Sequence, residues 1–220
     1  MVYGTEEALR RKTEGSSFSD GICQRPDRDG AIAQLSHTKK PVAYTSHCSH
    51  QGHRMYRHLS DFNAAWLHES ASTAKLLEAL TDASLSTRTD PSGRTLGQIA
   101  WHLVETLTEM LPSAGLALDF HIDAAAVPTS AAAIAAKYTE GAKRLGEAVA
   151  AQWNDASLLE VTNMYGMEWA RGFTLQCLVV HQAHHRGQLT ILMRQSGLAV
   201  PGMVGPSREE WQAMGMPAPL

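Results

Sequence analysis

Two histidines, His181 and His185, stand four residues apart in an apolar stretch without proline. In a helix, this spacing places both imidazoles on one face, one turn apart. Such a helix offers two nitrogen ligands to one transition metal, and another element must supply the third. His102, in the segment Ile99-Ala-Trp-His102-Leu-Val, is the candidate for that third ligand. The alternative is that all three are hydrogen-bonded core or surface histidines, because the spacing also occurs by chance.

Three neutral imidazoles with one open position are typical of catalytic rather than structural zinc sites. A divalent ion is therefore the expected cofactor at His102, His181 and His185. Zinc and nickel are the leading candidates, since imidazole suits both ions and the ligand set does not choose between them. Such an ion acts as a Lewis acid, or lowers the pKa of a bound water or thiol. Gln98 and Glu105, near His102, are candidates to orient its ring, although both residue types are also common on solvated helix surfaces.

Other ligand-type residues fit this site less well. His184 is turned about 100° around the helix from His185, which favours a supporting role over ligation. Cys177 lies off the stripe of the two ligands, and a free buried cysteine usually only packs. A separate cluster near the N-terminus has ligand residues at plausible spacing but lacks a partner cluster: His47-Cys48-Ser-His50-Gln-Gly-His53.

Amphipathic segments must position these residues. Apolar residues near helical spacing predict four helices, over about 55–80, 95–110, 130–153 and 169–195. The second should begin at the capping box of Thr95 and Gln98 and end at Pro112 and Gly115. A strand or hairpin arm near 160–163 and a short helix at 207–211 are also expected, the latter because Ser207 and Glu210 have the spacing of a capping box. Four helices of this length predict an all-α four-helix bundle.

The first 54 residues differ from the rest. They are rich in Gly, Ser, Asp, Arg and His, and their apolar residues occur singly, without a helical or strand period. Such a segment buries too little apolar surface to offset its ordering entropy. We therefore predict a largely disordered or spurious N-terminal extension over 1–54. The metal-binding bundle domain, with its Pro/Gly-rich tail, is predicted over 55–220.

The composition argues against several classes of protein. A net charge of −3 and a pI near 6.4 do not favour a nucleic-acid partner. No apolar run reaches the roughly 18 residues of a membrane span, and the N-terminus lacks the pattern of a secretory signal. Three cysteines do not make a disulfide framework, so a cytoplasmic protein is expected. Dinucleotide, P-loop, His-Glu-x-x-His and nucleophile-elbow motifs are all missing from the sequence.

Three segments carry a resemblance to a known family: Thr95-Leu-Gly-Gln-Ile-Ala-Trp-His102-Leu, His181-x3-His185-Arg-Gly-Gln-Leu189, and Gly197-x3-Pro201 with Gly205-Pro206-Ser207-x-Glu-Glu210. In these residues the chain resembles the DinB (YfiT-like) family of metal-binding four-helix bundles. The resemblance covers Met55 to about Trp211. It implies that the metal ligands are His102, His181 and His185.

The same resemblance implies a metal-dependent enzyme of the thiol S-transferase type. Its small-molecule substrate would include a thiol such as glutathione, bacillithiol or mycothiol. Two alternatives stay open: a non-catalytic, stress-associated metal-binding protein, and a metal-dependent hydrolase with Glu105 as its candidate base. Such bundles commonly pair through their helix faces, so a homodimer is a further option.

Overall fold

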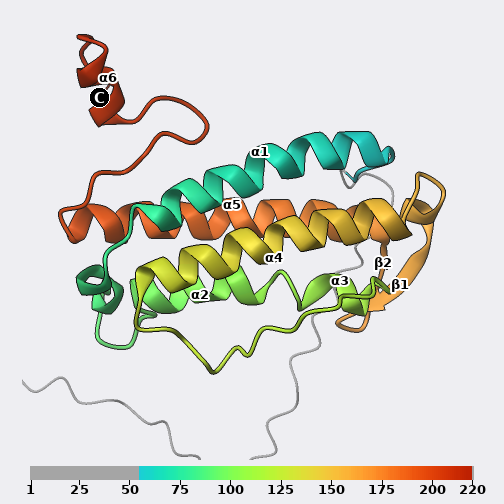
Figure 1. Cartoon of the computed structure of the whole chain (residues 1–220). Helices are drawn as coiled ribbons and strands as arrows, with labels where there is room; N and C mark the ends of the chain where they lie inside the picture. The colour runs from blue at the N-terminus through green and yellow to red at the C-terminus, as the bar shows by residue number, and fades with distance from the viewer. Residues whose placement is uncertain (1–54, 220) are drawn as a thin grey trace, which may run out of the picture. The chain divides into compact units, whose positions relative to one another are not determined.

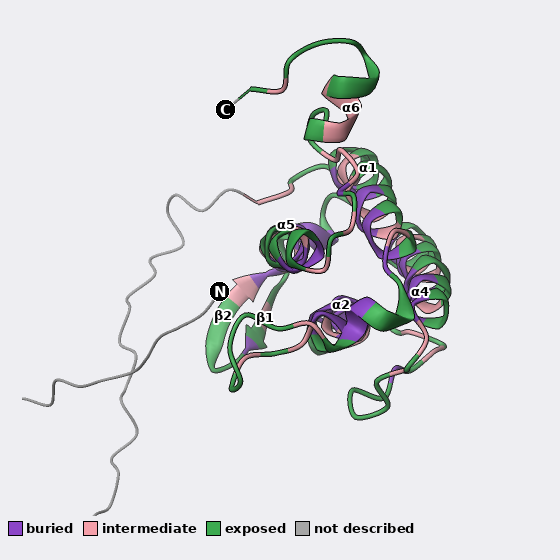
Figure 2. Ribbon diagram, turned by 90° about the vertical axis from the view of Figure 1, so that its left-hand side faces the viewer, coloured by how far each residue is buried: buried purple, intermediate pink, exposed green. Residues whose placement is uncertain are grey.

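Four main helices lie alongside one another around an apolar core in the computed structural model, which describes residues 55–219 (Figure 1). They are α1 (Leu59–Glu78), α2 (Leu96–Glu105), α4 (Ala131–Gln152) and α5 (Arg171–Gln195). Seen end-on, their buried faces point toward the interior that they enclose (Figure 2). The predicted all-α four-helix bundle is confirmed.

Two further sequence predictions concern the N-terminal extension and the lack of a membrane-spanning segment. The extension over 1–54, including the cluster of His47, Cys48, His50 and His53, lies outside the described residues. Among the helices of residues 55–219, none has the length and apolar character needed to cross a membrane.

Short elements connect the main helices. The 3-10 helices are η1 (Asp82–Ser86) and η2 (Ser157–Leu159), and a single helical turn forms α3 (Met110–Ser113). Strands β1 (Val161–Met164) and β2 (Met167–Ala170) form an antiparallel hairpin. Its turn residues, Tyr165 and Gly166, have φ angles of 55° and 83°, as a two-residue hairpin turn requires. The strand or hairpin arm predicted near 160–163 is therefore confirmed.

Capping residues fix where α2 and α4 begin. The Thr95 hydroxyl accepts a hydrogen bond from the Gln98 amide at 3.1 Å, and the Gln98 side chain accepts one from the Thr95 amide at 2.8 Å. This is the capping box that the sequence predicts. At the start of α4, Ser130 accepts a hydrogen bond from the amide of Ala133. The predicted starts of both helices are confirmed.

α2 ends earlier than predicted, at Glu105 rather than near residue 110. The carbonyl of Glu105 accepts both the amide of Thr108, at 3.0 Å, and its hydroxyl, at 3.3 Å. The amide of Leu107 likewise bonds only three residues back, to Val104 at 3.2 Å, and the hydroxyl of Thr106 bonds to the carbonyl of Leu103 at 3.0 Å. Because side-chain hydroxyls compete for these helical acceptors, the regular helix stops. Pro112 lies within α3 rather than ending α2, since proline is tolerated in the first turn of a helix. Gly115, with φ of 89°, follows α3.

Small residues on α4 let it approach its neighbours closely. A Cβ atom at Gly141 would lie 2.9 Å from the side chain of Leu107, and one at Gly146 would lie 3.2 Å from that of Trp66. The Trp66 indole in turn donates a hydrogen bond of 3.0 Å to the carbonyl of Ala142. α1 and α4 are thereby joined by both packing and a buried polar contact.

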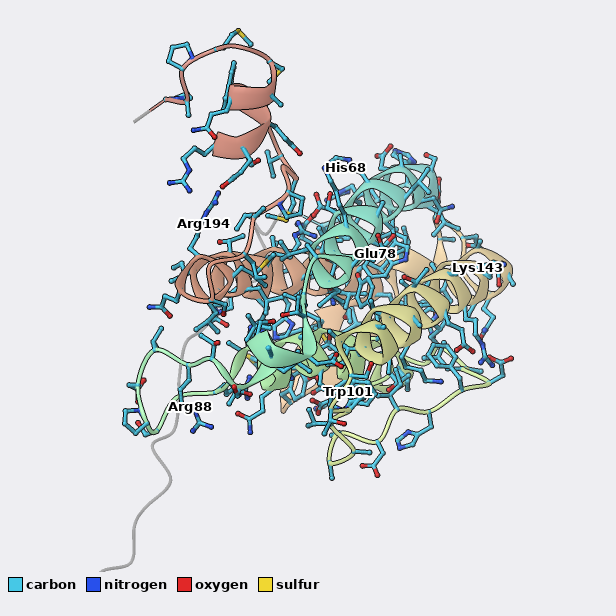
Figure 3. All side chains as sticks on the ribbon, turned by 60° about the vertical axis from the view of Figure 1, so that its left-hand side comes forward. His68, Glu78, Arg88, Trp101, Lys143 and Arg194 are labelled. Atoms are coloured by element: carbon cyan, nitrogen blue, oxygen red, sulfur yellow. The ribbon has the colours of Figure 1, made fainter. Side chains whose placement is uncertain are left out.

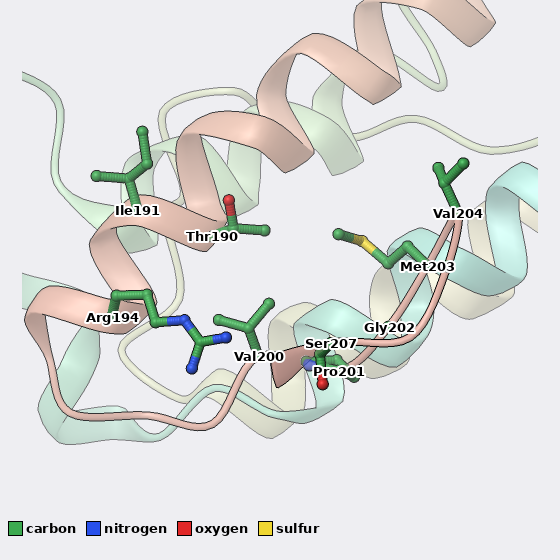
Figure 4. A pocket seen from close by; sticks show the side chains of 10 residues that line it. Thr190, Ile191, Arg194, Val200, Pro201, Gly202, Met203, Val204 and Ser207 are labelled. Carbon is green, nitrogen blue, oxygen red and sulfur yellow. The ribbon is translucent and has the colours of Figure 1, made fainter. Parts of the chain in front are cut away.

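The C-terminal helix α6 (Arg208–Ala213) contains no buried residue and begins with the predicted capping box. Ion pairs attach it to the bundle. Glu210 contacts Lys75 of α1 at 3.2 Å, and Glu209 pairs with Arg194 near the end of α5 (Figure 3). Arg194 also lines an open pocket of about 390 Å³ between α5 and the segment that follows it (Figure 4).

Candidate metal centre

α2 and α5 bring three histidines together, as the sequence predicts. His102 comes from α2, and His181 and His185 come from adjacent turns of α5. One ring nitrogen from each lies within 4.8 Å of the others. The Nε2 atoms of His181 and His185 are 3.1 Å apart, and the His102 ring centre lies 5.1 Å and 4.7 Å from theirs. Three imidazole donors at this separation suit a single transition-metal ion.

Two of these rings are oriented by side chains that follow them by three residues. Nδ1 of His102 lies 3.1 Å from a carboxylate oxygen of Glu105. Nδ1 of His185 lies 2.7 Å from the side-chain oxygen of Gln188. An acceptor at Nδ1 favours the tautomer that leaves Nε2 as a lone-pair donor, which is the usual support for a metal-bound histidine.

The sequence identified only one of these two orienting residues. Glu105 was a candidate, and it contacts His102 as proposed. Gln98, the other candidate, uses its side chain to cap α2 instead. Gln188 was not predicted. It follows His185 by three residues, as Glu105 follows His102, and this shared spacing could have identified it.

His181 differs from the other two histidines. Its Nδ1 is buried and has no hydrogen-bond partner within residues 55–219. Burial, together with the neighbouring His185, His102, His184 and Arg94, lowers the pKa of His181 to about 4. Burial also lowers the pKa of His185. Imidazoles that resist protonation keep their lone pairs available, so this donor set fits a divalent cation.

Two nearby residues stay outside the cluster, as expected. His184 is exposed, and its Nε2 lies 3.1 Å from the Gln188 amide nitrogen, so it contacts a residue that orients His185. Cys177 is half-buried and does not join the three histidines. Burial raises the pKa of the Cys177 thiol to about 11, which disfavours the thiolate that metals bind.

A buried glutamine fixes α2 against α5 beside the cluster. The side-chain amide of Gln182 donates to the carbonyl of Leu103 at 3.2 Å and to the hydroxyl of Thr106 at 3.1 Å. Its carbonyl accepts hydrogen bonds from Tyr138 at 3.0 Å and from Thr73 at 3.3 Å. Gln182 thus joins all four main helices. Because it neighbours His181 and bonds to the residue after His102, it sets the separation of the metal-ligand candidates.

The next turn of α5 carries a second buried polar contact. Arg186 forms an ion pair with Glu69 of α1 and donates a hydrogen bond of 3.0 Å to Thr73. The sequence pattern did not indicate the structural roles of Gln182 and Arg186. They fix α5, which carries His181 and His185, against the other main helices.

The sequence profile of the DinB family matches residues 55–218. The chain belongs to the DinB family. YrdA from Bacillus subtilis is 41% identical over 165 residues, which make up 75% of this chain and 99% of YrdA. A DinB-like protein from Bacillus cereus, known from its crystal structure, is 40% identical with a TM-score of 0.65. That match covers 67% of this chain and 99% of the Bacillus cereus chain.

The DinB fold also links this chain to a more distant structure. YfiT from Bacillus subtilis is 18% identical with a TM-score of 0.50, and the match covers 64% of this chain and 89% of YfiT. YfiT is described as a probable metal-dependent hydrolase with an unusual four-helix bundle topology. At this level of identity, the likeness concerns the fold.

A pocket of about 410 Å³ lies beside the histidine cluster of this DinB protein. His185 forms part of its wall. The rest of the wall comes from the loop before α2, the start of α2 and the C-terminal half of α5: Thr89, Arg94, Ile99, Gln188, Ile191 and Leu192. This volume is in the range of small-molecule binding sites.

Proposed function

We propose that His102, His181 and His185 bind one divalent ion, zinc or nickel, and that the protein is a metal-dependent thiol S-transferase. The observation that supports a reactive site is the number of donors. Within residues 55–219, no fourth histidine, cysteine or carboxylate joins the three histidines. Structural zinc sites are normally closed by four protein ligands, whereas catalytic sites keep a position for another ligand.

The ion, when bound, supplies Lewis acidity that favours the thiolate form of a sulfur substrate. The protein residues prepare the site for it. Glu105 and Gln188 favour the tautomers of His102 and His185 that carry the proton on Nδ1, which leaves Nε2 as the metal-donor atom. The pocket next to His185 has room for a small molecule beside these ligands.

Metal analysis tests the first half of this proposal. Purified protein loaded with zinc or nickel should hold about one ion per chain, and His102→Ala or His181→Ala should lose it. His184→Ala is the matched control, because His184 neighbours the cluster without joining it. Full occupancy in both alanine variants of the cluster would reject the site.

A transfer assay tests the second half. Glutathione, bacillithiol and mycothiol are each incubated with an electrophilic acceptor and the metal-loaded protein, and the thioether product is measured. We expect turnover with at least one thiol that stops on chelation and in His181→Ala. If no thiol supports turnover and chelation only lowers the melting temperature, the metal is structural and the transferase proposal is wrong.

The second candidate function is metal-dependent hydrolysis, which the description of YfiT favours. Hydrolysis would need a nearby carboxylate to accept a proton from water. Glu105 is the candidate, but its carboxylate is hydrogen-bonded to His102. Metal-dependent cleavage of an ester without any thiol, lost in Glu105→Gln, would favour this alternative over thiol transfer.

A further inference from the structure

Arg94 is a cation without a partner in the wall of the pocket beside His185. It is exposed and forms no ion pair or hydrogen bond with residues 55–219. Arg88, on the same loop, donates a hydrogen bond of 3.1 Å to the carbonyl of Pro91 (Figure 3). Arg88 does not line the pocket. The loop therefore presents one free guanidinium to this space.

The acidic residue of this loop is occupied elsewhere. Asp90 accepts hydrogen bonds from the amide and hydroxyl of Ser92, at 2.9 Å and 2.5 Å. These bonds lower the pKa of Asp90, so it is ionised but directed toward Ser92. No aspartate or glutamate lines the pocket. The charge of Arg94 is thus available to a ligand.

The remaining walls suit an organic molecule rather than a bare ion. Ile99, Ile191 and Leu192 give an apolar side, and Ile191 is 58% exposed. Thr89 and Gln188 add neutral polar groups. Arg94 and His185 line the same pocket. The cation, the apolar side and His185 therefore belong to one small site.

We propose that this pocket binds a small organic carboxylate, with the carboxylate on Arg94 and the apolar part along Ile99, Ile191 and Leu192 toward His185. One guanidinium balances one negative charge and matches the two oxygens of a carboxylate. The inference rests on the proposed function in that this pocket serves the substrate of the metal centre. Either the thiol or its acceptor then carries a carboxylate.

Nuclear magnetic resonance titration of the zinc-loaded full chain tests the proposal. The probe is 4-methylpentanoate, and 4-methylpentanamide has the same shape without the charge. We expect the carboxylate to shift the amide resonances of Gln188 and Ile191 saturably, and the amide to bind at least about tenfold more weakly. Arg94→Gln should weaken carboxylate binding by about tenfold or more. Arg94→Lys should retain part of it, and Arg88→Gln should match the wild type.

Several results would overturn the inference. These are equal binding of carboxylate and amide, unchanged affinity in Arg94→Gln, or shifts that map away from the pocket. A carboxylate bound to the zinc ion alone would leave the affinity unchanged in Arg94→Gln. The titration is repeated with His102→Ala, where dependence on Arg94 should persist. Dependence on Arg94 in a protein that transfers no thiol would leave this inference standing while the proposed function fails.

Discussion

The hydroxyl of Tyr138 donates a hydrogen bond of 3.0 Å to the side-chain carbonyl of Gln182, and both side chains are fully buried. Burial raises the pKa of Tyr138, so the hydroxyl stays a protonated donor. With the bonds to Thr73, Leu103 and Thr106, every donor and acceptor of the Gln182 amide is satisfied. A polar group at the centre of the bundle is therefore compatible with a stable core.

Replacing Gln182 should be costly. Gln182→Leu leaves buried hydroxyls without partners, so we expect the free energy of unfolding to fall by about 3 kcal/mol. Tyr138→Phe removes one of the four bonds and should cost about 1 kcal/mol. Urea unfolding of the metal-free proteins measures both, with Gln176→Leu, a partly exposed site on α5, as control. Wild-type stability in Gln182→Leu would show that the network contributes nothing.

The residues that orient the histidines should affect metal affinity without affecting the fold. Glu105→Ala and Gln188→Ala should each weaken zinc binding by about ten- to a hundredfold, because the Nδ1 proton of one ligand loses its acceptor. Competition with a chromophoric chelator gives the affinity. Glu109→Ala is the control, since Glu109 accepts a hydrogen bond from Tyr165 at 2.8 Å instead. Equal affinities in all three variants would refute the orienting role.

Cys177 should react slowly with alkylating reagents at neutral pH. Its pKa is raised to about 11 by burial, so the neutral thiol predominates until the pH approaches that value. The rate of alkylation by iodoacetamide should rise about tenfold per pH unit between roughly pH 7 and 9.5. Peptide mapping by mass spectrometry separates Cys177 from Cys23 and Cys48. A rate that levels off below about pH 9 would contradict the assignment.

The sequence predicts those parts of the fold that depend on local patterns. Apolar periodicity marks the four main helices, and the capping boxes at Thr95 and Ser207 mark two helix starts correctly. The early end of α2 was not predicted, because it depends on how the hydroxyls of Thr106 and Thr108 bond to the last turn. Such competition between side chain and backbone leaves no periodic signal.

The histidine cluster was predictable for two different reasons. His181 and His185 are linked by helix geometry alone, whereas His102 was assigned through its apolar surroundings and the family resemblance. Gln182 could not be recognised from the sequence. A polar residue beside a ligand looks like part of a solvated face, and only the contacts of three other helices show that it is buried. Arg94 was not predicted, because no regular sequence spacing marks a functional cation in a loop.

The attachment of α6 to the bundle relies on ion pairs, so it depends on salt and pH. With no buried residue, α6 depends on Arg194, Glu209, Lys75 and Glu210. Ion pairs at a surface are weakened by salt. The pairing with Arg194 lowers the pKa of Glu209 to about 2, so its contribution disappears as the pH falls from the usual carboxyl range toward that value. We therefore expect α6 to separate from the bundle in salt or acid before the four main helices unfold, so that the histidine cluster outlasts the attachment of the C-terminal helix.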